Sequence, residues 1–209
     1  MSLRERRDRD RARRQQLIVT AARELAETEG WEGVTVRRLA ERVEYSQPVL
    51  YSHFKDKADI VRAVALEGFG ELAAELDSAR TAAGSPAAAL RGLAAAYLRF
   101  AQTRPAVYDA MFVMPVDLPF AAADTPAAPR AAFAELRATL APLAGDRDLE
   151  TLGEVAWSAL HGLATLARSN RLRASHQQAR LDLLVEQLTR QPVEHLARQH
   201  FTAHQVEVA

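Results

Sequence analysis

The fold is decided by one stretch, residues 35–57, which reads TVRRLAERVEYSQPVLYSHFKDK. Thr35 suits the N-cap of a short helix over 36–43, because its hydroxyl can accept a hydrogen bond from a free backbone N–H. A second short helix is expected to open at Ser46, where a capping hydroxyl precedes a proline whose missing N–H costs nothing in the first turn. Two short helices joined by about three residues predict a helix-turn-helix.

The second helix of this stretch should have one buried and one outward face. Leu50 and Phe54 are four residues apart and are predicted to be buried together. By the helical period, the outward face then carries Pro48, Val49 and Ser52. Tyr51 and His53 lie at the sides of the helix.

Outside this stretch the apolar residues recur at helical spacing, and no strand-like alternation occurs. A first helix is predicted from Leu17 until Gly30 ends it, and Asp56 should cap a long helix over 57–80. Further helices are expected near 86–103, 105–113, 127–143, 147–169 and 174–190, and over 192–204. The proline-rich segment 115–130 predicts an ordered, irregular loop.

These patterns predict an all-α protein with two domains. Residues 1–56 would form a three-helix helix-turn-helix domain for DNA binding that includes a basic N-terminal arm. Residues 57–209 would form a helical bundle.

The charge balance hides an asymmetry along the chain. The 209 residues hold 27 basic and 27 acidic side chains, but residues 1–57 hold 13 Lys/Arg against 10 Asp/Glu, a net charge of +3. The positive end is where a polyanion would bind. Residues 4–14 include seven arginines and are interpreted in two ways, as a solvated, frayed helix start or as an arm that contacts DNA.

Several classes of protein are disfavoured by what the sequence lacks. It has no cysteine, which fits a reducing compartment, and we expect a cytoplasmic protein with no signal peptide and no membrane span. An all-helical enzyme is a competing hypothesis. No His/Glu metal pair, glycine-rich phosphate loop or spaced nucleophile and base supports it. We therefore expect no enzymatic activity, no cofactor and no metal.

The stretch 35–57, behind an amphipathic helix ending in Gly30-Trp31, closely resembles the DNA-binding domain of the TetR family of repressors. The resemblance covers about residues 11–66 and rests on the string Leu-Tyr-x-His-Phe-x-x-Lys. One departure is Glu44, since the family usually has glycine in this turn. A left-handed conformation there would cost a non-glycine residue about 1 kcal/mol.

The C-terminal half is similar to a TetR subgroup named for its Trp-His-Gly signature. The similar segments are residues 104–112 and 157–162.

The resemblance implies two kinds of DNA contact. The base-reading residues would be Gln47, Pro48, Val49 and Ser52, and the amide of Gln47 suits the edge of an adenine. The phosphate contacts would be Thr35, Arg37, Tyr51, His53 and Lys57. For Tyr51 and His53 the alternative is that they cover the small core.

Aromatic and methionine side chains suggest an adaptable apolar pocket in the C-terminal domain. The candidate ligand-binding residues are Tyr97, Phe100, Tyr108, Met111, Phe112, Met114, Phe120, Trp157 and His161. The alternative is plain core, with Trp157 packed inside and His161 hydrogen-bonded.

Two leucine-rich stripes suggest a four-helix interface between two copies of the chain. Their residues are Leu149, Leu152, Val155, Leu160 and Leu163, then Leu181, Leu184, Val185 and Leu188.

The expected function is a homodimeric, ligand-responsive regulator of transcription, a repressor released from a palindromic double-stranded DNA operator by a small apolar effector. The alternatives are an activator or a helical interaction module whose DNA binding is not ligand-controlled.

Overall fold

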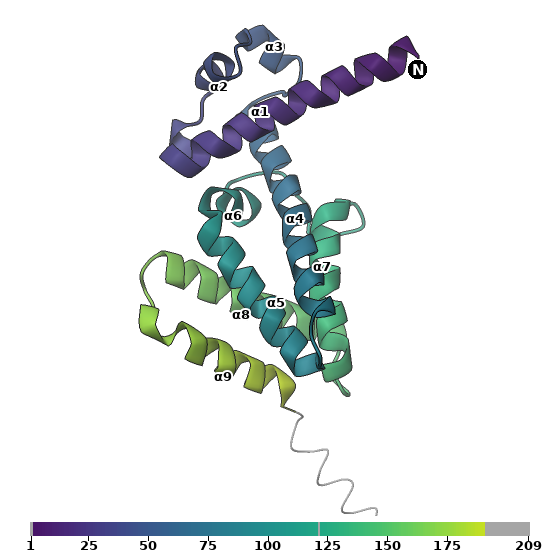
Figure 1. Ribbon diagram of the computed structural model, residues 1–209, viewed down its shortest axis with the longest axis vertical. Coiled ribbons are helices and arrows are strands. Elements are labelled where there is room, and N and C mark those ends of the chain that lie inside the picture. The colour runs from purple at the N-terminus through teal and green to yellow at the C-terminus, as the bar shows by residue number, and fades with distance from the viewer. Residues whose placement is uncertain (1, 121, 191–209) are drawn as a thin grey trace, which may run out of the picture.

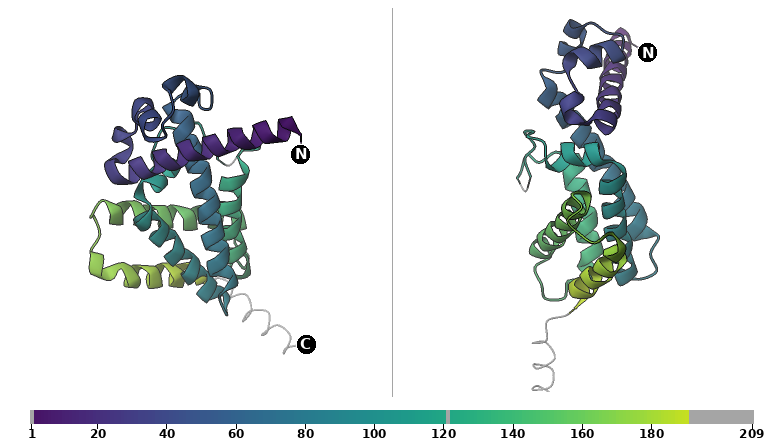
Figure 2. Two further views of the ribbon diagram at one scale, coloured as in Figure 1. Left: turned by 45° about the horizontal axis from the view of Figure 1, so that its top comes forward. Right: turned by 90° about the vertical axis from the view of Figure 1, so that its left-hand side faces the viewer.

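The computed structural model describes residues 2–120 and 122–190, and it is helical, with no strand in these ranges (Figure 1, Figure 2). The α-helices are α1 (Leu3–Gly33), α2 (Val36–Arg42), α3 (Gln47–Tyr51), α4 (Lys57–Thr81), α5 (Pro86–Thr103), α6 (Pro105–Phe112), α7 (Ala127–Leu140), α8 (Leu149–Arg168) and α9 (Gln177–Thr189). Two short 3-10 helices, η1 (Ala141–Leu143) and η2 (Ala174–His176), follow α7 and precede α9. The predicted all-α fold class is confirmed.

Helix α1 is regular from its first residues. The Ser2 hydroxyl accepts from the Glu5 N–H at 3.2 Å, and the Glu5 carboxylate accepts from the Ser2 N–H at 2.9 Å. This capping box satisfies two free donors and stabilises the first turns. Residues 4–14 therefore form an exposed helix, and their contact with DNA stays a prediction. At the other end Gly30, with φ of 76°, ends the regular run as predicted, and a short turn continues to Gly33.

The helix-turn-helix forms as the sequence predicts, with α2 one residue shorter. Thr35 caps α2, and its hydroxyl accepts from the Arg38 N–H at 3.3 Å. Glu44, in the turn, has the left-handed φ of 57° that its position suggested. The prediction that the Ser46 hydroxyl caps α3 is wrong, because that side chain bonds no backbone N–H. Pro48 occupies the second helical position and removes one of the donors that such a cap would use.

Helix α4 connects α1–α3, which we call the head, to the rest of the molecule (Figure 1). Its first turn is capped by Asp56, whose carboxylate accepts from the Asp59 N–H at 2.9 Å. Along its length it packs against α1, α6, α5 and α7. A single helix thus contacts both the head and the core of the bundle.

The C-terminal half differs from prediction mainly at helix ends. The helix expected over 127–143 changes to 3-10 geometry at Ala141, and the one expected over 174–190 begins with a 3-10 turn. The irregular loop is shorter than the predicted 115–130, because residues 127–130 belong to α7. The helix expected over 192–204 lies outside the described residues. No helix in the described ranges is long and apolar enough to cross a membrane.

The two stripes predicted to form a dimer interface are largely used within one copy of the chain. Helices α8 and α9 both pack on α5. This buries five of the nine residues: Leu152, Leu160, Leu181, Val185 and Leu188. For these five the prediction was wrong, because periodicity shows which residues are apolar but not which neighbour covers them. The most exposed apolar side chains on the two helices are Val155, Leu166 and Leu183.

Candidate DNA-binding surface and effector cavity

Helix α3 presents the predicted base-reading residues on one outward surface. Leu50 and Phe54 are buried beneath it, as predicted, and hold the helix in this orientation. The Ser52 hydroxyl donates to the Val49 carbonyl oxygen at 2.7 Å, so it is partly engaged within its own helix. The exposed residues are Gln47, Pro48 and Ser52, and Val49 is half-buried.

The residues predicted to contact phosphate surround this surface. Thr35 and Arg37 are exposed at the start of α2, and Arg37 forms an ion pair with Glu41 at 2.9 Å. Tyr51 is 54% exposed, so it does not cover the small core. Its hydroxyl can reach an external partner.

The other two predicted phosphate contacts, His53 and Lys57, are half-buried. Burial lowers the pKa of His53, and the nearby charges of Arg11 and Arg14 lower it further. His53 is therefore uncharged at neutral pH and can offer a phosphate a hydrogen bond but no net charge. The Lys57 ammonium donates to the Trp31 carbonyl oxygen at 2.5 Å, which leaves it two further donors.

The head is fastened to the bundle through α6. The Trp31 indole N–H donates to the Ala106 carbonyl oxygen at 2.8 Å, and this bond is buried. The Glu27 carboxylate accepts from the backbone N–H groups of Ala106 and Val107 at 3.2 and 3.3 Å, where the free N–H groups of a helix start favour negative charge. Because Lys57 bonds Trp31 as well, α1, α4 and α6 meet at one junction.

An apolar cavity of about 470 Å³ lies within the bundle. Helices α4, α5, α7 and α8 contribute most of its wall, and α4 and α7 run side by side there (Figure 1). Its apolar lining includes Phe69, Leu72, Leu76, Leu93, Phe133, Leu136 and Leu160. Four charged side chains also border it: Arg130, Arg137, Glu150 and Glu154.

Four of the nine predicted ligand-binding residues line this cavity: Tyr97, Phe112, Phe120 and Trp157. Phe120 comes from the α6–α7 loop and packs edge-on against Phe69, with ring centroids 5.6 Å apart. The structure places the other five elsewhere: Phe100, Tyr108, Met111, Met114 and His161. Phe100 is fully buried, with the Arg104 guanidinium 4.7 Å from its ring centroid.

The sequence reasoning missed the parts of the wall that α4 and α7 supply. Phe69, Leu72 and Leu76 formed a visible apolar stripe, but nothing in the stripe distinguishes a cavity wall from filled core. The contribution of α7 had no sequence signal.

A chain of neutral hydrogen bonds leads from the cavity wall to α8. The hydroxyls of Tyr97 and Tyr108 are 3.0 Å apart, and the Tyr108 hydroxyl is 2.7 Å from Nδ1 of His161. Burial raises the pKa of Tyr97 to about 12 and raises that of Tyr108 as well. Burial, followed by the charge of Arg168, lowers the pKa of His161. All three groups are therefore uncharged at neutral pH, and His161 is hydrogen-bonded, as one of the two interpretations expected.

Two family profiles match the chain. "Bacterial regulatory proteins, tetR family" covers residues 18–64, and "Tetracyclin repressor-like, C-terminal domain" covers residues 90–191. An HTH-type transcriptional regulator of Mycobacterium tuberculosis, Rv0681, is 32% identical over 155 residues, which are 71% of this chain and 67% of that protein. The chain spans smaller shares, from 22% to 50%, of three other curated relatives.

Solved structures share the fold. A protein of unknown function from Rhodococcus sp. RHA1 superposes with a TM-score of 0.71 at 24% identity, over 84% of this chain and 92% of that one. The transcriptional regulator FadR from Bacillus subtilis, solved in complex with stearoyl-CoA, superposes with a TM-score of 0.61 at 14% identity, over 81% and 97% of the two chains. The two profiles, the relative and the helix-turn-helix geometry agree, and the chain belongs to the TetR family of DNA-binding transcriptional regulators.

Proposed function

We propose that this protein is a ligand-responsive repressor that leaves a palindromic operator when a small apolar effector enters the cavity. It acts in the cytoplasm as a homodimer. Residues 1–56 form the DNA-binding head, and residues 57–209 form the effector-binding and dimerisation domain.

The observation that carries this proposal is that one helix belongs to both functional regions. Helix α4 lines the cavity with Phe69, Leu72 and Leu76, and its first residue, Lys57, bonds the Trp31 carbonyl of the head. A ligand that shifts α4 in the cavity therefore acts on the position of the head.

The cavity wall indicates the chemistry of the effector. Aromatic and aliphatic side chains dominate it, Tyr97, Thr125 and Trp157 add polar groups, and the four charged side chains named above border it. Such a site suits a compact apolar molecule with few hydrogen-bonding groups.

The coupling is expected to act through the spacing of the two heads in a dimer. Two recognition helices can occupy successive major grooves only when they lie about one helical turn, roughly 34–36 Å, apart or a multiple of it. An effector that prefers a different spacing weakens DNA binding by its differential affinity, and typical coupling energies of about 1–3 kcal/mol correspond to about 5–150-fold. The exposed Val155, Leu166 and Leu183 support α8 and α9 as the surface where the two copies meet.

The test begins with the operator and a cavity probe. Genomic fragments retained by the protein give the operator sequence, and anilinonaphthalene sulfonate serves as the first probe because its fluorescence rises in apolar sites. Compounds that displace the probe are then titrated by calorimetry into the free protein and into its operator complex. Because the two binding equilibria are linked, a compound that weakens DNA binding by a given factor must also bind the operator complex more weakly than the free protein by the same factor.

A matched pair of variants locates the effect in the cavity. Ala132 lines the cavity on α7, whereas its neighbour Ala131 is exposed and is not part of the lining. Ala132→Phe should bind operator but lose both the probe and the response, and Ala131→Phe should keep all three. Equal affinity of the compound for free and DNA-bound protein would overturn the allosteric proposal and leave a regulator, or an interaction module, without ligand control.

A further inference from the structure

The N-terminal turns of α1 form a stiff basic rod. The capping box of Ser2 and Glu5 starts the helix, which continues without interruption to the kink at Gly30. Residues 2–14 are exposed, and the N-terminal turns of α1 extend past the other helices around them (Figure 1). A continuous helix holds its side chains in a set direction, which a flexible arm cannot do.

Four arginines of this segment share one face of the helix. At about 100° per residue, Arg4, Arg7, Arg11 and Arg14 lie within an arc of about 80°. The same face continues into the buried Ile18, Ala22 and Leu25, and so it is turned toward the other helices of the head. We call Arg4, Arg7, Arg11 and Arg14 the arginine stripe.

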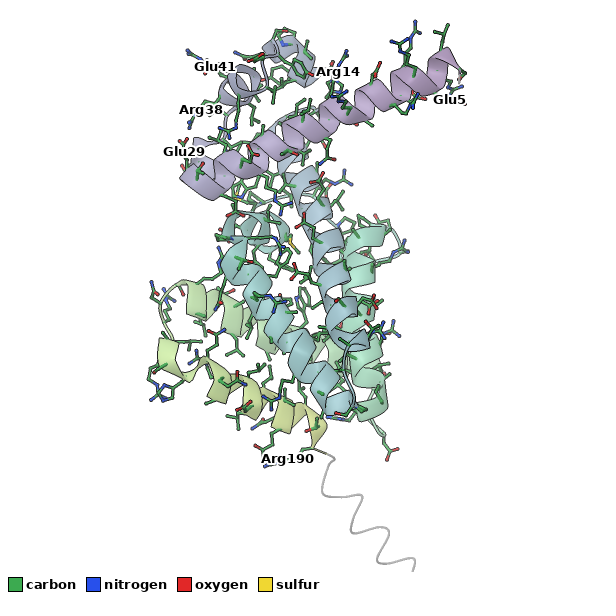
Figure 3. The ribbon with its side chains drawn as sticks, in the orientation of Figure 1. Glu5, Arg14, Glu29, Arg38, Glu41 and Arg190 are labelled. Carbon is green, nitrogen blue, oxygen red and sulfur yellow. The ribbon has the colours of Figure 1, made fainter. Side chains whose placement is uncertain are left out.

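The stripe runs past the end of the recognition helix. Arg11 donates from Nη2 to the Ser52 carbonyl oxygen at 3.4 Å, just beyond the last residue of α3. The charges of Arg11 and Arg14 reach His53, whose pKa they lower. Figure 3 places Arg14 on the side of α1 that carries α3. The stripe is therefore continuous with the surface that reads DNA.

The outer half of the stripe has no partner within the described part of the protein. Arg4 and Arg7 form no ion pair with a described residue, and the carboxylate of Glu5 is occupied by the helix cap. Asp8 and Asp10 point to the two sides of the stripe, about 80° from its centre. A row of exposed guanidinium groups whose neighbouring acids lie to its two sides matches the phosphates of a nucleic-acid backbone.

We propose that the arginine stripe is a second DNA-binding surface, which holds the phosphate backbone of duplex DNA beside the base pairs read by α3. The inference rests on α3 being the base-reading helix. From Arg4 to Arg14 the helix rises about 15 Å, which is the length of about four base-pair steps. The stripe supplies affinity from phosphates and carries no sequence preference.

The test compares two double variants of equal charge. Arg4→Ala/Arg7→Ala removes the outer stripe, and Arg6→Ala/Arg13→Ala removes two arginines that lie about 120° and 140° from the centre of the stripe on the same helix. Alanine preserves helicity, which far-UV circular dichroism should verify. Fluorescence anisotropy then gives the affinity of each protein for a minimal operator and for the same operator lengthened by random-sequence flanks.

Wild-type protein and the Arg6/Arg13 variant should bind the lengthened operator more tightly than the minimal one, and the Arg4/Arg7 variant should lose this gain. At about 0.9 units of salt slope per phosphate contact, the slope should fall by about 1.8 for each bound protomer. The advantage of wild type over the variant would then shrink about twelvefold for each protomer between 50 and 200 mM salt.

Three outcomes would overturn the inference. Equal losses in both double variants would show a general effect of net charge. Unchanged affinity in both double variants would show that the stripe does not contact DNA. Loss of discrimination between operator and random DNA in the Arg4/Arg7 variant would indicate base reading in place of phosphate binding. Failure of wild-type protein to select any sequence would instead reject the proposed function.

Discussion

Gly68 allows α4 and α6 to approach closely, and replacing it with alanine should destabilise the protein. A Cβ atom at this position would lie 2.5 Å from Cγ1 of Val107 and 2.7 Å from Sδ of Met111. Both neighbours are buried, and the β-branched Val107 has little rotamer freedom. Overpacking of this kind typically costs about 1–3 kcal/mol.

Gly70 is the matched control, because it lies two residues away on α4 and a Cβ there meets nothing within 4 Å. Both substitutions gain about 1 kcal/mol of helix propensity, so the difference between them isolates the overpacking. Urea denaturation should show Gly68→Ala about 1–3 kcal/mol less stable than Gly70→Ala, with unchanged m values. In a double-mutant cycle, Met111→Ala should recover part of that loss. Equal stability of the two glycine variants would refute the close α4–α6 packing.

The remaining predictions concern DNA and pH. Gln47→Ala should cost about 1–3 kcal/mol on the operator and little on random DNA, and equal losses on both in a binding assay would contradict base reading. Arg37→Ala should weaken binding to all sequences and flatten the salt slope by about one unit, whereas an unchanged slope would remove it from the phosphate contacts. The lowered pKa of His161 means that the unfolded chain binds its proton more readily. The free energy of unfolding should therefore fall as the pH drops from about 7 to 5.5, and His161→Asn should make this fall shallower in urea titrations. An equally steep fall in the variant would show that His161 is not its source.

The head was largely predictable from the sequence because its structure depends on residues close together in the chain. The Thr35 cap and the buried pair of Leu50 and Phe54 follow from local spacing, and the left-handed Glu44 follows from the resemblance to the TetR family. The structure has all three features. The absence of a side-chain cap at Ser46 also has a local cause. Pro48 favours the start of a helix, but it lacks a backbone N–H that the Ser46 hydroxyl could bond. The start of α1 depends on a capping box of Ser2 and Glu5, which apolar periodicity does not reveal.

The cavity was only partly predictable, because its wall is assembled from four helices far apart in sequence. Aromatic character led to Tyr97, Phe112, Phe120 and Trp157, which line the cavity. The same character could not distinguish them from Phe100, which is buried elsewhere. The apolar stripes of α8 and α9 were visible, but it was their packing on α5 that decided which residues remain exposed.

The sequence by itself therefore determined the helices, the helix-turn-helix and the direction in which α3 faces, since hydrogen bonds and apolar periods within a few residues specify them. Only the tertiary structure decided three further features: the cavity beside α4, the junction of Trp31 with Ala106, and the hydrogen-bonded chain from Tyr97 through Tyr108 to His161. The physical reason is that these features join residues separated by long stretches of chain. Their contacts depend on how whole helices pack, which no local pattern encodes.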